Sequence, residues 1–433
     1  MGVIYAKAGL SVVLTAAVYV VVSARRGRRF VTETPAANAF GAMAAMLAAI
    51  VLLRVLPFVA LYVIYGARPT SDVADYFWPW AQGAAAGQVV YRDFDMHFGP
   101  LFPYVLSLAL FVWSDPRAIV LLMVIVEVGA IIATSWLMWS EGPPEKIATA
   151  VIAYLLSPAP LIFVIQSGQE DVWLWAVAAV VGVAVLRRRD GLAGAISAVG
   201  ALATKALLGF GVFAMLCGSM RPKVFLKVAA AVMAVALPPL VAIGGSKVFT
   251  LPLAEARVAS PPNVWFALNA LTGGHMDLGS RVFLVVSLVV LMSLILLCTD
   301  QRAAANAGPR QYCAAWVITY ALFMLFSVKS LGNYACIFLL PLTFLGILDD
   351  DKRLMSLTMA LSALVSIQTS LWYRLDRPTY HHMTILADGA HAAEFMMSAA
   401  LLAILVAVIV RSRRYLTTEA SPVAMESREA SIA

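Results

Sequence analysis

Charged residues are scarce in this chain of 433 residues: Asp, Glu, Lys and Arg make up 13%, whereas hydrophobic residues make up 62%. Soluble domains carry about 25% charged residues, so the composition excludes a water-soluble globule and a disordered chain. Cysteine is scarce as well. Cys217, Cys298, Cys313 and Cys336 lie in or beside apolar runs and form no CxxC pair, which argues against a disulfide framework and a cysteine metal site.

Several signatures of nucleotide-dependent and hydrolytic chemistry are also missing. The chain has no Walker A loop, no HExxH, no GxSxG and no dinucleotide fingerprint, which disfavours an ATP-driven transporter and a soluble nucleotide-sugar enzyme. The net charge of +7 does not indicate nucleic acid, because membrane proteins concentrate Lys and Arg in their cytoplasmic loops. The first apolar run lacks a basic start and a small-residue cleavage site, so we expect no cleaved signal peptide.

What the chain does contain is a series of long apolar runs. Runs of about 15–25 residues can each cross the hydrocarbon core of a bilayer. We therefore expect an all-α polytopic membrane protein with about 11–13 transmembrane helices. The runs 191–204 and 206–220 are short, and we interpret them as candidates for one broken or re-entrant element. The predicted spans are 9–24, 38–65, 116–139, 147–165, 172–186, 191–204, 206–220, 224–244, 281–299, 312–327, 334–348, 354–372 and 388–410.

Basic residues decide the predicted orientation. Arg25–Arg29, Arg187–Arg189 and Arg411–Arg414 fall on one face when the spans alternate, and the positive-inside rule makes that face cytoplasmic. The N-terminus and a long first loop then face outward, and the C-terminus faces the cytoplasm. This assignment requires that the short apolar run 100–113 forms an interfacial helix and not a span.

The expected organisation has four parts. Residues 1–65 form two transmembrane helices, and residues 66–115 form a partly helical extracytoplasmic loop rich in acidic and aromatic side chains. Residues 116–410 form the remaining bundle, with outer loops at 245–280 and 372–387. Residues 411–433 form a polar cytoplasmic tail, which we expect to be disordered.

The first outer loop concentrates the polar residues. Asp72 directly follows a span, so its carboxylate should lie at the membrane boundary, where partial desolvation suits a general base. The alternative is a helix cap, since SDVAD has N-cap chemistry. Asp75 shares a helical face with Asp72, and a divalent cation between the two acids stays an open alternative. The aromatic residues form either an interfacial belt or a platform for sugar rings.

Further polar residues face the same side. Gln169–Asp171 begin the span 172–186, either as site residues or as a capped helix start. Lys205 and Lys329 lie at outer ends of spans, where a lysine needs a partner; an anionic lipid phosphate is one candidate, and snorkelling to the surface is the alternative. Adjacent His381 and His382 cannot both bind one metal from a regular element, so this pair alone is not expected to form a metal site. A substrate contact is the alternative that we keep for His381.

These segments resemble bacterial polytopic glycosyltransferases of the GT-C superfamily, especially actinobacterial-type members. The first loop carries the pattern in Ser71-Asp72, Tyr76, Gly87-Gln88, Tyr91–Phe94 and Phe98–Pro100. GQED before a span ending in RRR, TK after AGAISAVGALA, and KSLGNYACIFLLPL with its Lys, Tyr and Pro are similar to further family segments. One departure stands out: Met96–Pro100 replaces the usual Glu-Tyr-Pro-Pro.

The resemblance implies a hexosyl- or pentosyltransferase of the bacterial plasma membrane. Such enzymes transfer a sugar from a polyprenyl-phosphate donor to a hydroxyl of a cell-envelope glycan or glycolipid at the outer face, usually with inversion. Asp72 would deprotonate the acceptor hydroxyl, and Lys205, Lys329 and Arg92 would face the developing charge of the lipid phosphate. The other candidate substrate-binding residues are Asp75, Tyr76, Tyr91, Asp93, Asp95, His97, Gln169, Asp171, Tyr334 and His381.

A secondary transporter or a lipid or glycolipid flippase is the alternative function. Such a protein keeps ionisable residues in mid-span, facing a central pathway. Arg54 and Glu127 are the main ionisable residues predicted deep in spans, whereas most charge lies on one face. That distribution favours an enzyme at one interface, and the polar first loop counts against a purely structural scaffold.

Overall fold

The computed structural model describes residues 2–27, 35–273, 275–299, 307–376 and 389–417. In these ranges the chain is an all-α polytopic membrane protein without strands, as predicted. Seven of the described helices are long and apolar enough to cross a membrane. They are α1 (Gly2–Gly27), α2 (Pro35–Ile50) continued by η1 (Val51–Val55), α3 (Leu56–Phe58) and η2 (Val59–Ile64), α6 (Arg117–Leu137), α12 (Pro222–Gly244), α15 (Arg281–Cys298), α18 (Lys352–Asp376) and α19 (Gly389–Thr417).

Shorter helices complete the bundle. The pair Pro144–Leu155 and Pro158–Gln166, bent by 54°, adds an eighth candidate span if the two helices cross the membrane as one. Each predicted apolar segment overlaps a helix, but length and composition support only seven or eight of the predicted crossings. The shorter helices are α7 (Pro144–Leu155), α8 (Pro158–Pro160), η5 (Leu161–Gln166), α9 (Val172–Leu186), α10 (Asp190–Ala203), η6 (Ala206–Gly211), α11 (Val212–Met215), α16 (Pro309–Phe326), η8 (Gly332–Ala335) and α17 (Cys336–Leu348).

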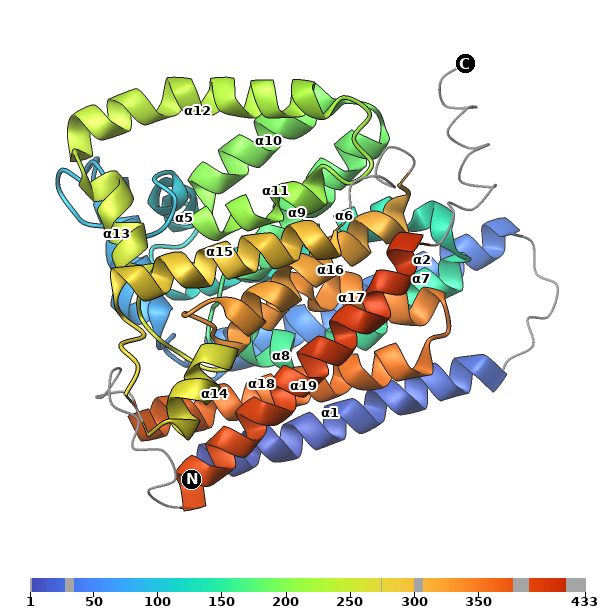
Figure 1. The fold of residues 1–433 in the computed structure, drawn as a ribbon. Coiled ribbons are helices and arrows are strands. Elements are labelled where there is room, and N and C mark those ends of the chain that lie inside the picture. Colours follow the sequence, from blue (N-terminus) through green and yellow to red (C-terminus); the bar gives the residue numbers. More distant parts are fainter. Residues whose placement is uncertain (1, 28–34, 274, 300–306, 377–388, 418–433) are drawn as a thin grey trace.

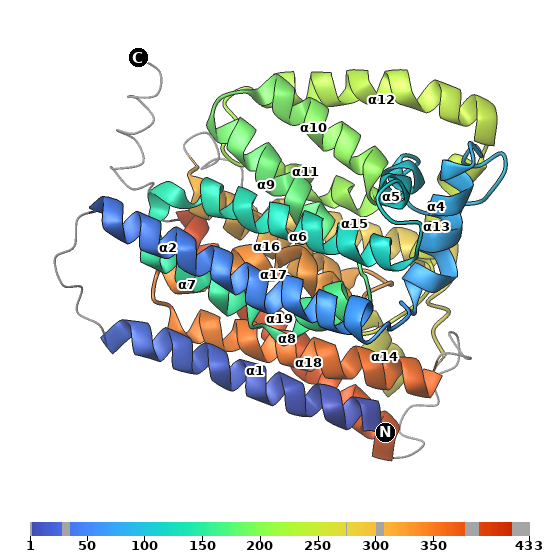
Figure 2. The same ribbon diagram turned by 180° about the vertical axis from the view of Figure 1, so that it is seen from behind.

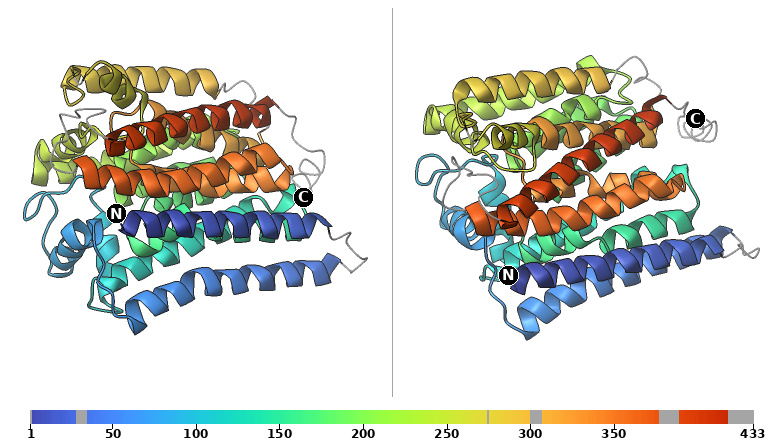
Figure 3. Two further views of the ribbon diagram at one scale, coloured as in Figure 1. Left: turned by 90° about the horizontal axis from the view of Figure 1, so that it is seen from below. Right: turned by 60° about the horizontal axis from the view of Figure 1, so that its bottom comes forward.

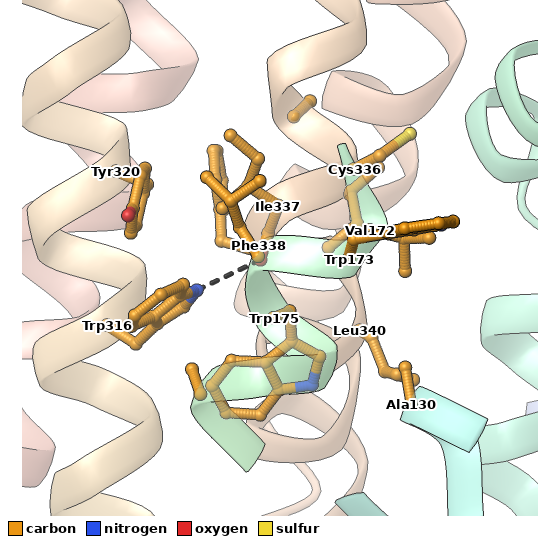
Figure 4. Packing of buried hydrophobic residues seen from close by; sticks show 14 of the residues in the cluster. Ala130, Val172, Trp173, Trp175, Trp316, Tyr320, Cys336, Ile337, Phe338 and Leu340 are labelled. Carbon is orange, nitrogen blue, oxygen red and sulfur yellow. Dashed lines mark hydrogen bonds between the residues drawn. The ribbon is translucent and has the colours of Figure 1, made fainter. Parts of the chain in front are cut away.

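The short helices are the most deeply buried ones. Every side chain of α17 is buried, and α16 and α9 lie beside it (Figures 1 and 4). Two indoles fill this core: Trp175 Nε1 donates to Thr134 Oγ1 at 2.7 Å, and Trp316 Nε1 donates to the Ile337 carbonyl at 2.9 Å (Figure 4). Buried indoles need such acceptors, so these bonds fix the arrangement of the central helices.

The loop helices gather at one end of the bundle, called the loop end below. They are η3 (Val73–Phe77), α4 (Trp78–Ala85), α5 (Phe102–Leu110), α13 (Lys247–Ala256) and α14 (Val264–Leu271). Figures 1 and 2 show α5, α13 and α14 together there, with the start of α1 at the same end. Figure 3 shows that the last turns of α19 lie at the opposite end. With nine residues, α5 is too short to span, in agreement with the interfacial interpretation.

The ionisable residues predicted deep in spans pair with each other. Arg54 Nε and Nη2 donate to the two carboxylate oxygens of Glu127 at 2.6 and 2.9 Å, and both side chains are fully buried. Arg54 Nη1 also donates to the carbonyls of Leu53 and Leu155 at 2.8 and 3.0 Å. Since the charges compensate each other and the guanidinium is well bonded, this pair braces η1 against α6 and offers little to a transport pathway.

Candidate functional site

Asp72 lies at the loop end, immediately before η3. Its side chain makes no capping bond to that helix, so the cap alternative is wrong for this structure. Instead, Asp72 Oδ2 accepts a hydrogen bond from Gln169 Nε2 at 3.0 Å. Burial raises the pKa of Asp72 above its ordinary value, although the bond from Gln169 and the charges of Lys205 and Lys329 act in the opposite direction.

A break in the chain brings Lys205 to the same place. The helix α10 ends at Ala203, Lys205 is extended, and the chain returns through the 3₁₀ helix η6 and α11. The broken element predicted for this region is therefore present. Lys205 Nζ pairs with Asp171 Oδ1 at 2.9 Å and with Glu170, and both carboxylates are completely buried. It also lies 4.9 Å from the ring centre of Phe98 and 5.3 Å from that of Tyr334.

Asn333 links Asp72 to the Lys205 group. Its Nδ2 donates to Gln169 Oε1 at 3.0 Å and to Asp171 Oδ2 at 2.5 Å. Gln169 thus donates to Asp72 and accepts from Asn333, which produces a continuous chain of contacts from Asp72 to Lys205. Every amide in this chain has one orientation that satisfies both neighbours, so the carboxylates are held in fixed positions.

Glu170 is the least satisfied member of this group. Its Oε1 lies against Lys205, while its Oε2 has no hydrogen-bond donor among the described residues. Burial raises the pKa of Glu170 to about 7, helped by Asp171 and Asp72 and opposed by Lys205. For Lys205, burial lowers the pKa, but Asp171 and Glu170 outweigh that effect and raise it well above its ordinary value.

Lys329 and Glu255 form the second ion pair of the site. Lys329 follows α16, and its segment pairs with the segment between α13 and α14: Ser260 N donates to the Val328 carbonyl at 3.2 Å, and Ser330 N donates to the Ser260 carbonyl at 3.1 Å. Nearby His97 packs on Tyr76, Trp80 and Phe98. Burial lowers the pKa of His97 to about 4, partly opposed by Glu255, so its imidazole is neutral at pH 7.

The first loop is held against the break in α10 by its backbone. Gly99 N donates to the Thr204 carbonyl and Leu101 N to the Leu202 carbonyl, both at 2.8 Å. A Cβ on Gly99 would lie closer than 3.0 Å to the Leu202 carbonyl, so only glycine permits this approach. Position 99, where the chain departs from the family pattern, thus fixes the loop on the Lys205 segment.

The remaining first-loop candidates form separate contacts. Arg92 is exposed and pairs with Asp93 at 2.8 Å, and Asp95 pairs with Lys247 at 2.9 Å. Arg92 is therefore engaged at the surface and does not join the two lysines, which corrects its assignment as a phosphate ligand. Tyr91 is buried and packs against Gly244.

Asp75 lies within η3, and Tyr76 beside it is partly exposed and packs on Trp80 as well as on His97. His381 lies outside the described residues. The described residues contain no group of three or more His, Cys, Asp or Glu side chains that could hold a metal ion. The cation alternative for Asp72 and Asp75 therefore gains no support.

The structure gives both lysines partners from the protein itself, where the sequence had offered a lipid phosphate or snorkelling to the surface. Lys205 is neutralised by two carboxylates and Lys329 by one. The physical reason is desolvation: a lysine ammonium held away from water needs a nearby negative charge, and side chains of the same protein supply it.

The sequence pattern gave no indication of Glu255 and no role for Asn333, and it left Glu170 open between a site residue and part of a capped helix start. Glu255 lies in α13, far along the chain from Lys329, and no local pattern indicates their contact. The unusual density of carboxylates in GQED was the available signal for Glu170.

Neither a comparison with protein-family models nor one with curated proteins finds a match for this chain. The resemblance to GT-C glycosyltransferases therefore rests on the sequence motifs alone. Asp72, Gln169, Asp171, Lys205, Lys329 and Tyr334 come from four distant segments and meet at the loop end.

Proposed function

We propose that the protein is a bacterial plasma-membrane glycosyltransferase that takes a sugar from a polyprenyl-phosphate donor at the outer face. The acceptor is a hydroxyl of a cell-envelope glycan or glycolipid, and Asp72 is the general base. The observation that carries the proposal is the environment of Asp72: a desolvated carboxylate, held by Gln169, within the electrostatic influence of Lys205 and Lys329. A partly desolvated carboxylate suits a reaction that removes a proton. The two lysine ammoniums, although paired with carboxylates of the protein, are the positive charges offered to the phosphate that is released.

The proposed reaction is a single displacement. Gln169 occupies Oδ2 of Asp72, so Oδ1 is the oxygen that takes the proton from the acceptor hydroxyl. The acceptor oxygen then bonds to the anomeric carbon while the bond from that carbon to the phosphate oxygen breaks. The lipid phosphate leaves with the bonding electrons, and attack from the opposite side inverts the anomeric centre.

A membrane-embedded enzyme suits this donor. The polyprenyl tail stays in the bilayer, and the reacting phosphate and sugar lie at its surface, where the loop end gathers its polar side chains. Tyr76, His97 and Trp80 form an aromatic group beside the site, and such faces stack on sugar rings. We assign the acceptor or donor sugar to this group.

The test of the base is Asp72→Asn. We expect loss of sugar transfer by about 10²–10⁴-fold, because the amide cannot take the proton. Transfer is measured with purified protein and radiolabelled polyprenyl-phosphate sugars on envelope lipid acceptors. Asp115→Asn is the matched control: Asp115 also lies in the first loop but pairs with Arg117 at 2.6 Å, so this variant should retain transfer.

Full transfer by the Asp72→Asn variant would remove the base assignment. A second result would contradict the proposed glycosyltransferase activity as a whole. This result is movement of a lipid-linked sugar across the membrane of sealed vesicles without formation of a glycosidic bond. That outcome would make the protein a flippase or transporter.

A further inference from the structure

The two buried ion pairs of the site differ in how firmly each lysine is held. Lys205 contacts two carboxylates with no exposed area, and one of them, Asp171, is itself bonded by Asn333. Lys329 contacts Glu255, whose side chain is 35% exposed. Release of Lys205 would strand two buried charges, whereas release of Lys329 would only return Glu255 to water. The side chains of Lys205 and Lys329 are about equally exposed, at 15% and 16%, so the difference lies in the partner: the counter-ion of Lys329 is the one that can leave at lower cost.

The two segments that carry Lys329 and Glu255 also differ in how firmly they are held. The Lys329 segment is fixed by backbone bonds to Ser260. Glu255 lies near the end of α13, a short helix in which Val248 is the buried residue. This helix follows Gly245, whose φ of +57° lies in the left-handed region. If the pair separates, Glu255 is therefore the partner that moves.

We propose that Glu255 occupies the position of a ligand phosphate on Lys329 and is displaced when a lipid phosphate binds. This inference rests on the proposed function and adds to it a displaceable counter-ion. Displacement exchanges one anion for another, so the Lys329 charge stays compensated throughout. The cost of removing Glu255 weakens phosphate binding, and this keeps the leaving lipid phosphate, whose charge approaches −2 at neutral pH, from remaining bound.

Glu255 has to be ionised in order to compete with an incoming anion for Lys329. Burial raises the pKa of Glu255, but Lys329 outweighs that effect with help from His97 and Lys205, so its pKa lies below the ordinary value. Glu255 is therefore ionised at neutral pH and competes with an anion. A neutral isostere keeps the shape of the side chain and removes the competition.

The test measures binding of farnesyl phosphate, a short isoprenyl monophosphate, to the full-length protein in detergent by tryptophan fluorescence. We expect Glu255→Gln to lower Kd about five- to tenfold, Glu255→Asp to stay near the native value, and farnesol to bind all proteins equally. In the Lys329→Gln background, Glu255→Gln should give no gain, because the gain acts through Lys329.

Asp115→Asn is the matched control, since it removes an ion-paired carboxylate of the first loop, the partner of Arg117. The inference is wrong if Glu255→Gln binds no more tightly than the native protein, if the gain persists without Lys329, or if Asp115→Asn gives the same gain. If native protein binds farnesyl phosphate and Glu255 has no effect, only this inference fails. If no variant binds it, the inference and the lipid-phosphate donor fail together.

Discussion

At the scale of single residues, the site depends on side chains that hold other side chains. Gln169 donates to Asp72 and accepts from Asn333, which in turn donates to Asp171. A carboxylate that is partly desolvated and has one bonded oxygen stays in one place and keeps a raised pKa. Gln169 therefore acts as a positioning residue, and Asp72 is the group assigned to the chemistry.

Replacement of Gln169 should change the pH dependence of transfer. The bond from Gln169 stabilises the ionised form of Asp72 and so lowers its pKa. In Gln169→Leu the pKa of Asp72 rises further, and the acidic limb of the pH–rate profile moves to higher pH by about one unit. The measurement is kcat/KM for sugar transfer between about pH 4 and pH 9.

Gln82→Leu makes the same chemical change at an exposed position of α4 in the first loop. It should leave the profile unchanged. An equal shift in both variants, or no shift in Gln169→Leu, would show that the acidic limb of the pH–rate profile does not report the pKa of Asp72.

At the scale of helices, close backbone approach decides how α10 and α12 pack. A Cβ on Gly194 would lie closer than 3.0 Å to the Phe225 carbonyl oxygen. Backbone atoms cannot rotate out of the way as a side chain can, so a methyl group here must push the helices apart. This contact matters for the site because α10 ends next to Lys205 and α12 leads into α13.

Gly194→Ala should destabilise the protein by about 1–3 kcal/mol, the usual cost of overpacking. Gly191→Ala on the same helix is the matched control, because its Cβ would meet Val228 at 3.7 Å, an ordinary contact. It should be neutral or slightly stabilising, since alanine favours helix over glycine. Thermal unfolding in detergent measures both variants, and equal unfolding temperatures would contradict the packing argument.

At the scale of the whole molecule, charge divides between the two ends. The loop end carries Asp72 and the lysine pairs, while the opposite end carries a separate set of ion pairs. There Arg411 binds Asp351 at 2.6 and 2.9 Å, and Lys146 binds Asp350 at 2.6 Å. The group around Asp72 therefore lies at one end only, and it is on that end that the proposed chemistry depends.

The positive-inside rule predicts that the loop end faces outward. In a background without native cysteines, Thr272→Cys in the outer loop at 245–280 should react in intact cells with a thiol reagent that cannot cross the membrane. Lys352→Cys, exposed at the start of α18, should react only after the cells are opened. The reverse pattern would put the site on the cytoplasmic side and exclude an outward-facing transferase.

The amino-acid sequence by itself determined the fold class, the positions of the apolar helices, the break before Lys205 and the short helix in the first loop. These features follow from local hydrophobic length and from helix-breaking segments. Tertiary structure decided which charges meet. Lys205 with Asp171, Lys329 with Glu255 and Arg54 with Glu127 join segments far apart in the chain. A charge removed from water needs a partner wherever the fold brings one close, and no local pattern of residues records that distance.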